Sequence, residues 1–310
     1  MAGALVLMSS GASRVGDADA QDRLRATIEA GLTRRGVDDV AIRHVSSPAE
    51  SEAALAAAIA AGTATVVVVG GDGTVRTAVA ALAETDVELG IVPVGTGNLF
   101  AAALELPRNP QVAAQALATA RVRKVDSAGV EIAGRRDGYA VGAGVGFDAR
   151  VMDHTPARDK VRFGIGAYFM SAIRLLSSLP VARTTATVDG KRYEFDAVAT
   201  MVINCGQIIP GKVGPRAPVL LDDGLLDLVA IRGAGSFGGL FKASRSGLSA
   251  LFSGAESTRG SIRLRGREIS VTTDPPEPMQ LDGDLIEGAE GRFRAWVRPG
   301  SLRVLVPFGP

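Results

Sequence analysis

A glycine-rich turn between a predicted strand and a predicted helix carries the residues best suited to chemistry. Residues 64–75 are ATVVVVGGDGTV, and the β-branched run before the glycines is typical of a strand that is buried on both faces. The glycines at 70, 71 and 73 permit close backbone approach, and the first N–H groups of the following helix have no intrahelical partner. The turn is therefore suited to bind a phosphate group.

Asp72 is the one residue of this turn that phosphate binding does not explain by itself. A carboxylate repels a polyphosphate unless positive charge lies between them, so the turn predicts a divalent cation or a transferred proton nearby. The alternative is a tight turn that binds no ligand. We favour the ligand-binding interpretation because a structural turn has no need of the acid.

A second glycine turn follows the next predicted strand. Residues 89–98 are LGIVPVGTGN, a strand that ends in Gly-Thr-Gly-Asn. Because ligands of parallel sheets bind outside the carboxyl ends of the strands, both turns are expected to border one crevice. Thr74, Thr96 and Asn98 are then candidate contacts for the phosphate or ribose of a nucleotide.

Two acidic turns in the second half of the chain add further candidates. They are LDDGLLD at 221–227 and QLDGDL at 280–285. Taken singly, each is typical of an ordinary hairpin turn. Beside a phosphate-binding turn they offer what phosphoryl transfer requires, namely a cation site and an acceptor for the hydroxyl proton.

The elements that must position these residues change character near residue 121. Alternating strands and helices predict a doubly wound, parallel α/β domain over residues 1–121. Short alternating segments then predict an antiparallel β domain over residues 122–310, interrupted by an apolar helix at 165–179, and the extreme C-terminus is a candidate to pack back on the first domain. The predicted strands are 4–8, 40–45, 65–69, 89–94, 129–132, 185–188, 197–203, 225–231, 261–264, 268–272, 293–297 and 302–306.

Composition and charge argue against several classes of function. The net charge of +1 gives no basic field that would hold nucleic acid. The single cysteine, Cys205, allows neither an internal disulfide nor a cysteine-based metal site, which favours a cytoplasmic location. We see no signal peptide, and no apolar stretch reaches the roughly 18 residues that a transmembrane helix needs.

The motifs, in their order along the chain, resemble those of the soluble diacylglycerol-kinase-like lipid kinases. That family includes bacterial diacylglycerol and phosphatidylglycerol kinases and the sphingosine and ceramide kinases. The resemblance covers nearly the whole chain and implies an N-terminal domain like that of NAD kinases and phosphofructokinases, a C-terminal β-sandwich-like domain, and ATP held between them. The matching segments are GGDGTV at 70–75, PVGTGNLFAAAL at 93–104, VGAGVGFDARV at 141–151, LDDGLLDL at 221–228 and LDGD at 281–284.

The resemblance also implies roles for single residues. Asp284 would accept the proton of the lipid hydroxyl, and Asp72 and Asp282 would complete a network of acids, water and metal. A structural Mg²⁺ would be held by Asp223 and the carbonyl oxygens of Leu220 and Leu225. The implied ATP contacts are Ser10, Gly11, Ser46, Gly71, Asp72, Gly73, Thr74, Val75, Arg76, Thr77 and Thr96.

Two positions depart from the family's pattern. Such kinases usually have Asn-Pro-x-Ser-Gly after the first strand, whereas this chain has Leu-Met-Ser-Ser-Gly at 7–11. The family also commonly has Glu where Asp284 stands, and the shorter acid must sit closer to the hydroxyl or act through water.

We therefore expect an ATP- and Mg²⁺-dependent lipid kinase that transfers the γ-phosphoryl group to a hydroxyl of a diacylglycerol-like or related lipid. The expected partner is a lipid presented at a membrane surface, with transient membrane association, no nucleic acid and no transmembrane segment; a homodimer is an open alternative to a monomer. Two other functions stay open. One is an NAD kinase-like enzyme: NAD kinases share the GGDG turn, but this chain lacks the Asn-Glu motif that is expected after it. The other is a catalytically weak lipid-binding protein.

Overall fold

The chain forms two compact units in this computed structural model, which describes residues 3–9, 18–146, 180–205, 219–232 and 261–307. The first unit comprises Met1–Ser127 and Arg298–Pro310, and the second comprises Ala128–Val297. The chain thus enters the second unit after Ser127, whereas the sequence predicted a boundary at residue 121. The last residues group with the first unit.

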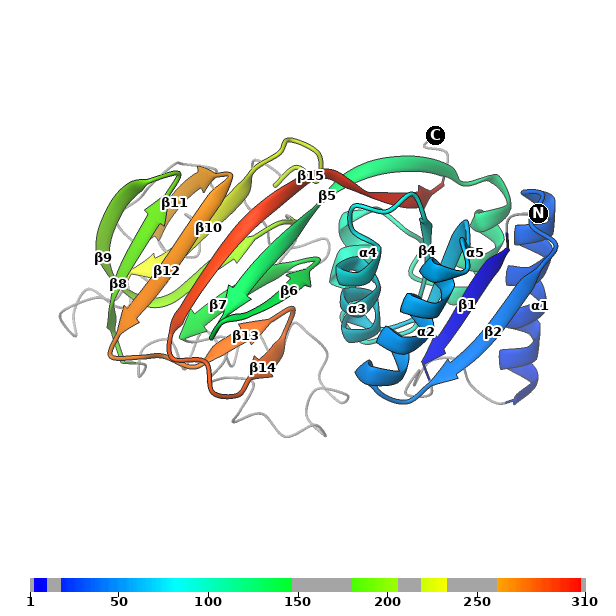
Figure 1. The fold of residues 1–310 in the computed structure, drawn as a ribbon, viewed down its shortest axis with the longest axis horizontal. Helices are drawn as coiled ribbons and strands as arrows, with labels where there is room; N and C mark the ends of the chain where they lie inside the picture. Colours follow the sequence, from blue (N-terminus) through cyan, green and yellow to red (C-terminus); the bar gives the residue numbers. More distant parts are fainter. Residues whose placement is uncertain (1–2, 10–17, 147–179, 206–218, 233–260, 308–310) are drawn as a thin grey trace. The chain divides into compact units, whose positions relative to one another are not determined.

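A parallel sheet forms the centre of the first unit (Figure 1). Its strand order is β4-β3-β1-β2, and each neighbouring pair is parallel. The C-terminal part of β15 (Arg292–Val306) runs parallel beside β4. The other strands are β1 (Ala4–Ser9), β2 (Val40–Val45), β3 (Thr65–Gly70) and β4 (Glu88–Pro93).

Helices cover both faces of this sheet. On one face, Leu24, Ile28 and Leu32 of α1 pack in a core with α5, and on the other face α2 packs with α3. β1, β3 and β4 are buried along almost their whole length, which explains their continuous apolar runs, whereas the edge strand β2 is largely exposed. The predicted doubly wound domain is therefore confirmed. The helices are α1 (Ala18–Arg34), α2 (Pro48–Ala60), α3 (Asp72–Leu82), α4 (Leu99–Ala103), α5 (Pro110–Ala116) and the 3₁₀ turn η1 (Leu117–Thr119).

The register brings the carboxyl ends of the strands to one edge of the sheet. Ser9 lies opposite Val45, and Gly70 lies opposite Pro93. β1 pairs with β2 on one side and with β3 on the other, so the direction of winding changes at β1. Ligands of open α/β sheets bind at such a switch point.

The second unit is an antiparallel β structure, as the sequence predicted. Its strand order is β14-β13-β7-β9-β8-β12-β15, while β10 pairs with β9 and β11, and β5 pairs with β6. Tyr139, Leu226, Ile269 and Phe293 belong to its buried core. The strands are β5 (Arg121–Ile132), β6 (Arg135–Tyr139), β7 (Gly142–Gly146), β8 (Ala182–Val188), β9 (Lys191–Ile203), β10 (Leu226–Arg232), β11 (Ser261–Gly266), β12 (Glu268–Asp274), β13 (Met279–Leu281) and β14 (Asp284–Ile286).

Several element predictions need correction. The predicted strands 293–297 and 302–306 form one strand, β15, that continues through Pro299 and Gly300. Proline and glycine suggested a turn, but the N–H of Gly300 donates to the Asp126 carboxylate at 2.7 Å. This hydrogen bond keeps residues 299–300 within the strand. The predicted helix at 165–179 lies outside the described residues. None of the described helices has the length and apolar character needed to cross a membrane.

Candidate functional site

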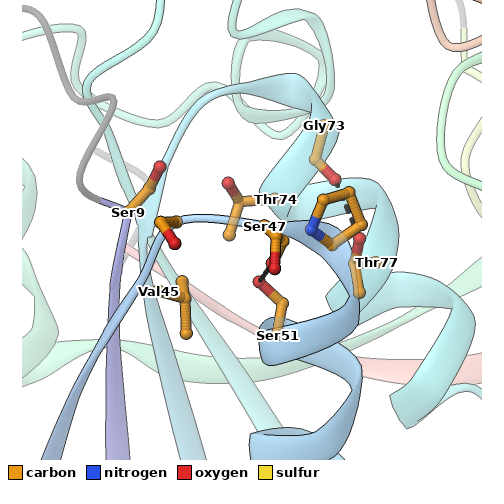
Figure 2. A pocket seen from close by; sticks show the side chains of 9 residues that line it. Ser9, Val45, Ser47, Ser51, Gly73, Thr74 and Thr77 are labelled. Atoms are coloured by element: carbon orange, nitrogen blue, oxygen red, sulfur yellow. Dashed lines mark hydrogen bonds between the residues drawn. The ribbon is translucent and has the colours of Figure 1, made fainter.

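A pocket of about 180 Å³ lies at the carboxyl ends of β1 and β2, beside the first turns of α2 and α3 (Figure 2). Most of its lining residues carry hydroxyl groups. Among the described residues, no acidic or basic side chain lines it. The lining residues are Ser9, Val45, Ser46, Ser47, Pro48, Ser51, Gly73, Thr74 and Thr77.

The start of α2 fixes one side of the pocket. Ser47 caps the helix and accepts a hydrogen bond from the Glu50 N–H at 3.2 Å. The Glu50 carboxylate in turn accepts from the backbone N–H of Ser46 at 2.7 Å and from its hydroxyl at 2.9 Å. Glu50 therefore orients the pocket residue Ser46. The S-x-x-E spacing of residues 47–50 is typical of a capping box, so the sequence alone could have singled out Glu50.

These hydrogen bonds also affect the ionisation of Glu50. The backbone N–H and then the hydroxyl of Ser46 lower the pKa of the Glu50 carboxyl. Because the folded-state pKa is depressed, the stabilisation is present at neutral pH and is lost as the pH falls through that pKa. The orientation of Ser46 is therefore secured at neutral pH.

The start of α3 forms the opposite side of the pocket. A Cβ atom at Gly70 would lie 2.8 Å from Cβ of Thr74, so glycine at this position lets the helix begin directly after the strand. The hydroxyl of Thr77 donates to the carbonyl oxygen of Gly73 at 3.2 Å. The first N–H groups of α3, which have no intrahelical partner, belong to this same turn.

Asp72 joins the two glycine turns. Its Oδ2 accepts from the N–H of Asn98 and its Oδ1 accepts from the N–H of Leu99, each at 2.7 Å. The Asn98 side chain in turn bonds both the N–H and the carbonyl oxygen of Gly95, at 3.0 and 2.7 Å. The carboxylate thus stabilises the first residues of α4, a structural role that the sequence did not reveal.

The glycines of the two turns are required by this close packing. A Cβ atom at Gly95 would lie 2.6 Å from Cα of Gly71, and one at Gly97 would collide with Oδ2 of Asp72. Side chains at these positions would push the turns apart. The glycine pattern therefore serves the contact between the turns as well as the approach of a ligand.

The structure gathers some of the predicted ATP contacts at the pocket and leaves others outside it. Ser46, Gly73, Thr74 and Thr77 line it, whereas Gly71, Asp72 and Arg76 belong to the adjoining turn and helix. Val75 is buried in the core, and its N–H donates to the carbonyl oxygen of Gly71 at 3.0 Å. Thr96 is exposed on the second glycine turn. Ser10 and Gly11 lie outside the described residues.

Asp282 is a buried anchor in the second unit. It lies between β13 and β14 with a left-handed φ of 48°, and only 9% of its surface is exposed. Its carboxylate accepts three backbone N–H groups at 2.8 Å, those of Ala140, Val141 and Gly142. Burial, followed by the negative charge of Asp282, raises the pKa of the neighbouring Tyr139 well above its usual value. These hydrogen bonds show that Asp282 anchors the hairpin to residues 140–142.

We predict that Asp282→Asn destabilises the second unit. The amide keeps one acceptor oxygen but turns an NH₂ group toward backbone N–H donors, so charge-assisted hydrogen bonds worth about 1.5–3 kcal/mol each are lost. Thermal or urea unfolding would measure the change. The exposed Glu290→Gln is the matched control, and a variant that unfolds like the wild type would contradict the anchoring role.

Asp284 differs from Asp282 in its surroundings although it is only two residues away. It is the first residue of β14, opposite Leu281 of β13, and its side chain is exposed. Gln280 holds the turn before it, because its side-chain oxygen accepts from the N–H of Gly283 at 2.7 Å. Asp284 is therefore the accessible acid of this hairpin.

The turn at Asp223 is arranged differently from the expected metal site. One carboxylate oxygen of Asp223 accepts from the N–H of Leu225 at 3.1 Å, and the other pairs with the guanidinium of Arg265. Leu220 is 47% exposed. No group of three or more His, Cys, Asp or Glu residues in the described part of the chain is placed to hold a metal. Because the arginine covers the acid, these residues do not fit a divalent cation at Asp223.

Comparison with known proteins identifies the family. The sequence matches the diacylglycerol kinase catalytic domain over residues 11–130 and the YegS C-terminal NAD kinase beta sandwich-like domain over residues 140–306. It is also 31% identical to a protein of Pseudomonas aeruginosa PAO1 named "Probable lipid kinase YegS-like", over 93% of this chain and 91% of that protein. The chain belongs to the YegS-like lipid kinase family.

Other relatives agree with this membership of the family. The chain is 28% identical to the uncharacterized protein sll0036 of Synechocystis over 77% of its own length, and spans 54% of that relative. A crystal structure of a diacylglycerol kinase from Bacillus anthracis str. Sterne is similar in fold, with a TM-score of 0.72 and 22% sequence identity. The match covers 99% of this chain and 97% of the Bacillus chain. At that identity the structural likeness establishes the shared fold.

Proposed function

We propose that this chain transfers the γ-phosphoryl group of ATP to a hydroxyl of a diacylglycerol-like or related lipid. The observation that carries the proposal is the hydroxyl-lined pocket at the switch point of the parallel sheet, where the starts of α2 and α3 converge. Membership of the lipid kinase family supports the lipid as the acceptor. Because the substrate is a lipid, we also propose transient association with a membrane surface.

The pocket has the chemistry of an anion site. The hydroxyls of Ser9, Ser47 and Thr74 can donate hydrogen bonds to phosphate oxygens, whereas those of Ser46, Ser51 and Thr77 already donate within the chain. No carboxylate among the described lining residues repels a phosphate. The N-terminal ends of α2 and α3 add partial positive charge and N–H donors. About 180 Å³ is enough for part of a nucleotide, so we assign the pocket to phosphate or ribose.

A divalent cation fits this assignment. The described pocket residues carry no positive charge, so a triphosphate needs a counter-ion that arrives with it. When bound, Mg²⁺ supplies charge neutralisation at the phosphates. Asp72 immediately precedes the pocket residue Gly73, and carboxylate oxygens are ligands that Mg²⁺ prefers. We therefore propose Asp72 as the carboxylate that contacts the cation.

Asp284 is the proposed proton acceptor. In the transfer, the lipid hydroxyl oxygen forms a bond to the γ-phosphorus as the bond from that phosphorus to the β–γ bridging oxygen breaks, and ADP leaves. The hydroxyl proton passes to the Asp284 carboxylate. Its exposure at the start of β14 is what supports this role, since a base must be reachable by the hydroxyl.

The proposal is tested by incubating the purified protein with γ-labelled ATP, Mg²⁺ and a panel of lipid alcohols in mixed micelles. The panel contains diacylglycerol, phosphatidylglycerol, monoacylglycerol, ceramide and sphingosine, and NAD serves as the non-lipid control. Label in one or more lipids supports the proposal. Label in NAD alone would identify an NAD kinase-like enzyme, and lipid binding without any transfer would identify a lipid-binding protein.

A milder prediction concerns the pocket hydroxyls. Thr74→Val keeps the shape of the side chain but removes its hydrogen bond to a phosphate, which is worth about 1.5–3 kcal/mol when one partner is charged. We expect KM for ATP to rise by roughly 10- to 100-fold with the lipid KM unchanged. Steady-state kinetics would check this against Thr187→Val on β8, where valine suits the strand. An unchanged KM for ATP would place the nucleotide elsewhere.

A further inference from the structure

Two arginines of β11, Arg263 and Arg265, pair with acids of β10 and of the turn before it. β10 and β11 are antiparallel, and Asp227 lies directly opposite Arg265. The Asp227 side chain is completely buried, and its Oδ1 lies 2.6 Å from Nε of Arg263 and 3.4 Å from Nε of Arg265. A buried carboxylate is costly without such partners, so this strand depends on the arginines.

Arg265 also reaches the turn itself. Its guanidinium pairs with Asp223, whose side chain is 18% exposed, while that of Arg265 is 41% exposed. One planar guanidinium thus joins Asp223 of the turn to Asp227 of the strand, and such a group can donate to two acceptors at once. The neighbouring acid of the turn, Asp222, is exposed.

The charges of this cluster are therefore balanced within the protein. Two shielded carboxylates, Asp223 and Asp227, meet two guanidinium groups, those of Arg263 and Arg265. A divalent cation at Asp223 would have to displace or repel Arg265. One carboxylate oxygen of this cluster, the buried Oδ2 of Asp227, has no hydrogen-bond partner among the described residues.

We propose that Arg265, together with Arg263, is a built-in replacement for a structural divalent cation at this turn. The positive charge that holds the turn to β10 is covalently part of the chain. The second unit then folds with full stability in the absence of metal. This inference concerns the stability of the fold and does not depend on the kinase proposal.

The test is thermal unfolding without nucleotide, in EDTA and in millimolar Mg²⁺. Wild type should melt at the same temperature in both. Arg265→Gln should lower the melting temperature by roughly 3–10 °C in either buffer, because the charged hydrogen bond to Asp223 and the ion pair with Asp227 are lost. Arg265→Lys keeps the charge, but a lysine ammonium pairs less effectively with two acids at once. Its melting temperature should therefore lie between those of the wild type and Arg265→Gln.

Arg267→Gln changes an exposed arginine directly after β11; it is the matched control and should melt like the wild type. The proposal is overturned if Mg²⁺ raises the melting temperature of the wild type, which would show that a cation reaches the turn, for example through Oδ2 of Asp227. It is equally overturned if Arg265→Gln melts like the control. If Arg265→Gln fails to fold, the EDTA comparison on wild type and Arg265→Lys still decides the matter.

Discussion

Asp72→Asn is expected to reduce turnover by on the order of 10²-fold or more and to lower the stability of the first unit. The carboxylate accepts the N–H groups of Asn98 and Leu99 with its two oxygens. The amide replaces one acceptor by an NH₂ group that opposes a backbone N–H. A charge-assisted hydrogen bond of this kind is worth about 1.5–3 kcal/mol, and a displacement of about 1 Å at a reacting site can cost 10²-fold in rate.

Gly97→Ala separates the structural role of Asp72 from its charge. The added methyl group would collide with Oδ2 of Asp72 while the carboxylate itself remains. If the bridge between the glycine turns is what turnover requires, Gly97→Ala should reproduce most of the loss. If the charge alone matters, Gly97→Ala should retain turnover far better than Asp72→Asn.

Turnover with saturating ATP and lipid, together with urea unfolding, would measure both effects. Asp86→Asn, an exposed acid of the same unit, is the control and should behave like the wild type. Wild-type turnover of Asp72→Asn with unchanged Mg²⁺ dependence would remove Asp72 from the proposed mechanism.

Asp284→Asn is expected to lower kcat by roughly 10²- to 10⁴-fold while ATP binding stays almost normal, since loss of a general base acts on the transition state. The side chain is exposed, so the melting temperature should change far less than in Asp282→Asn. This separates it from Asp282→Asn, whose main effect should be on stability. The two neighbouring acids thus have opposite expected signatures.

Asp284→Glu gives the sharper result. If the shorter acid merely stands in for a glutamate, the longer side chain should retain or improve kcat. If the hairpin is built around aspartate, kcat should fall. Kinetics on each accepted lipid would decide, with the exposed Glu287→Gln as the control. Should Asp284→Asn keep full kcat on every lipid, another residue accepts the proton.

Much of the first unit could be predicted because its signals are local. β-branched runs such as residues 65–69 predict buried strands, and the 3.6-residue repeat of Leu24, Ile28 and Leu32 predicts a helix. Glycine turns after parallel strands must share one edge of the sheet, which is where the pocket lies. The sequence therefore indicated this edge of the sheet, although the second glycine turn, residues 95–98, does not line the pocket.

The second unit was predicted less completely, since its strands are short and its pairing is not local. The prediction gave an antiparallel β structure but missed β6, β7, β13 and β14. It also divided β15 at Pro299 and Gly300, where a proline and a glycine normally indicate a turn. A long-range hydrogen bond from Gly300 to Asp126 outweighs that local preference.

The sequence by itself determined which acids are present, and only the tertiary structure decided what each one meets. Asp72 accepts from the N–H of Asn98, at a separation of 26 residues, and Asp282 accepts from the N–H of Ala140, at a separation of 142 residues. Asp223 pairs with Arg265, at a separation of 42 residues. Such pairs depend on strand register and on the packing of turns, which no local pattern encodes. For this reason Asp-Gly turns that look alike in the sequence become a bridge between turns at Asp72, a buried anchor at Asp282 and an arginine-paired turn at Asp223.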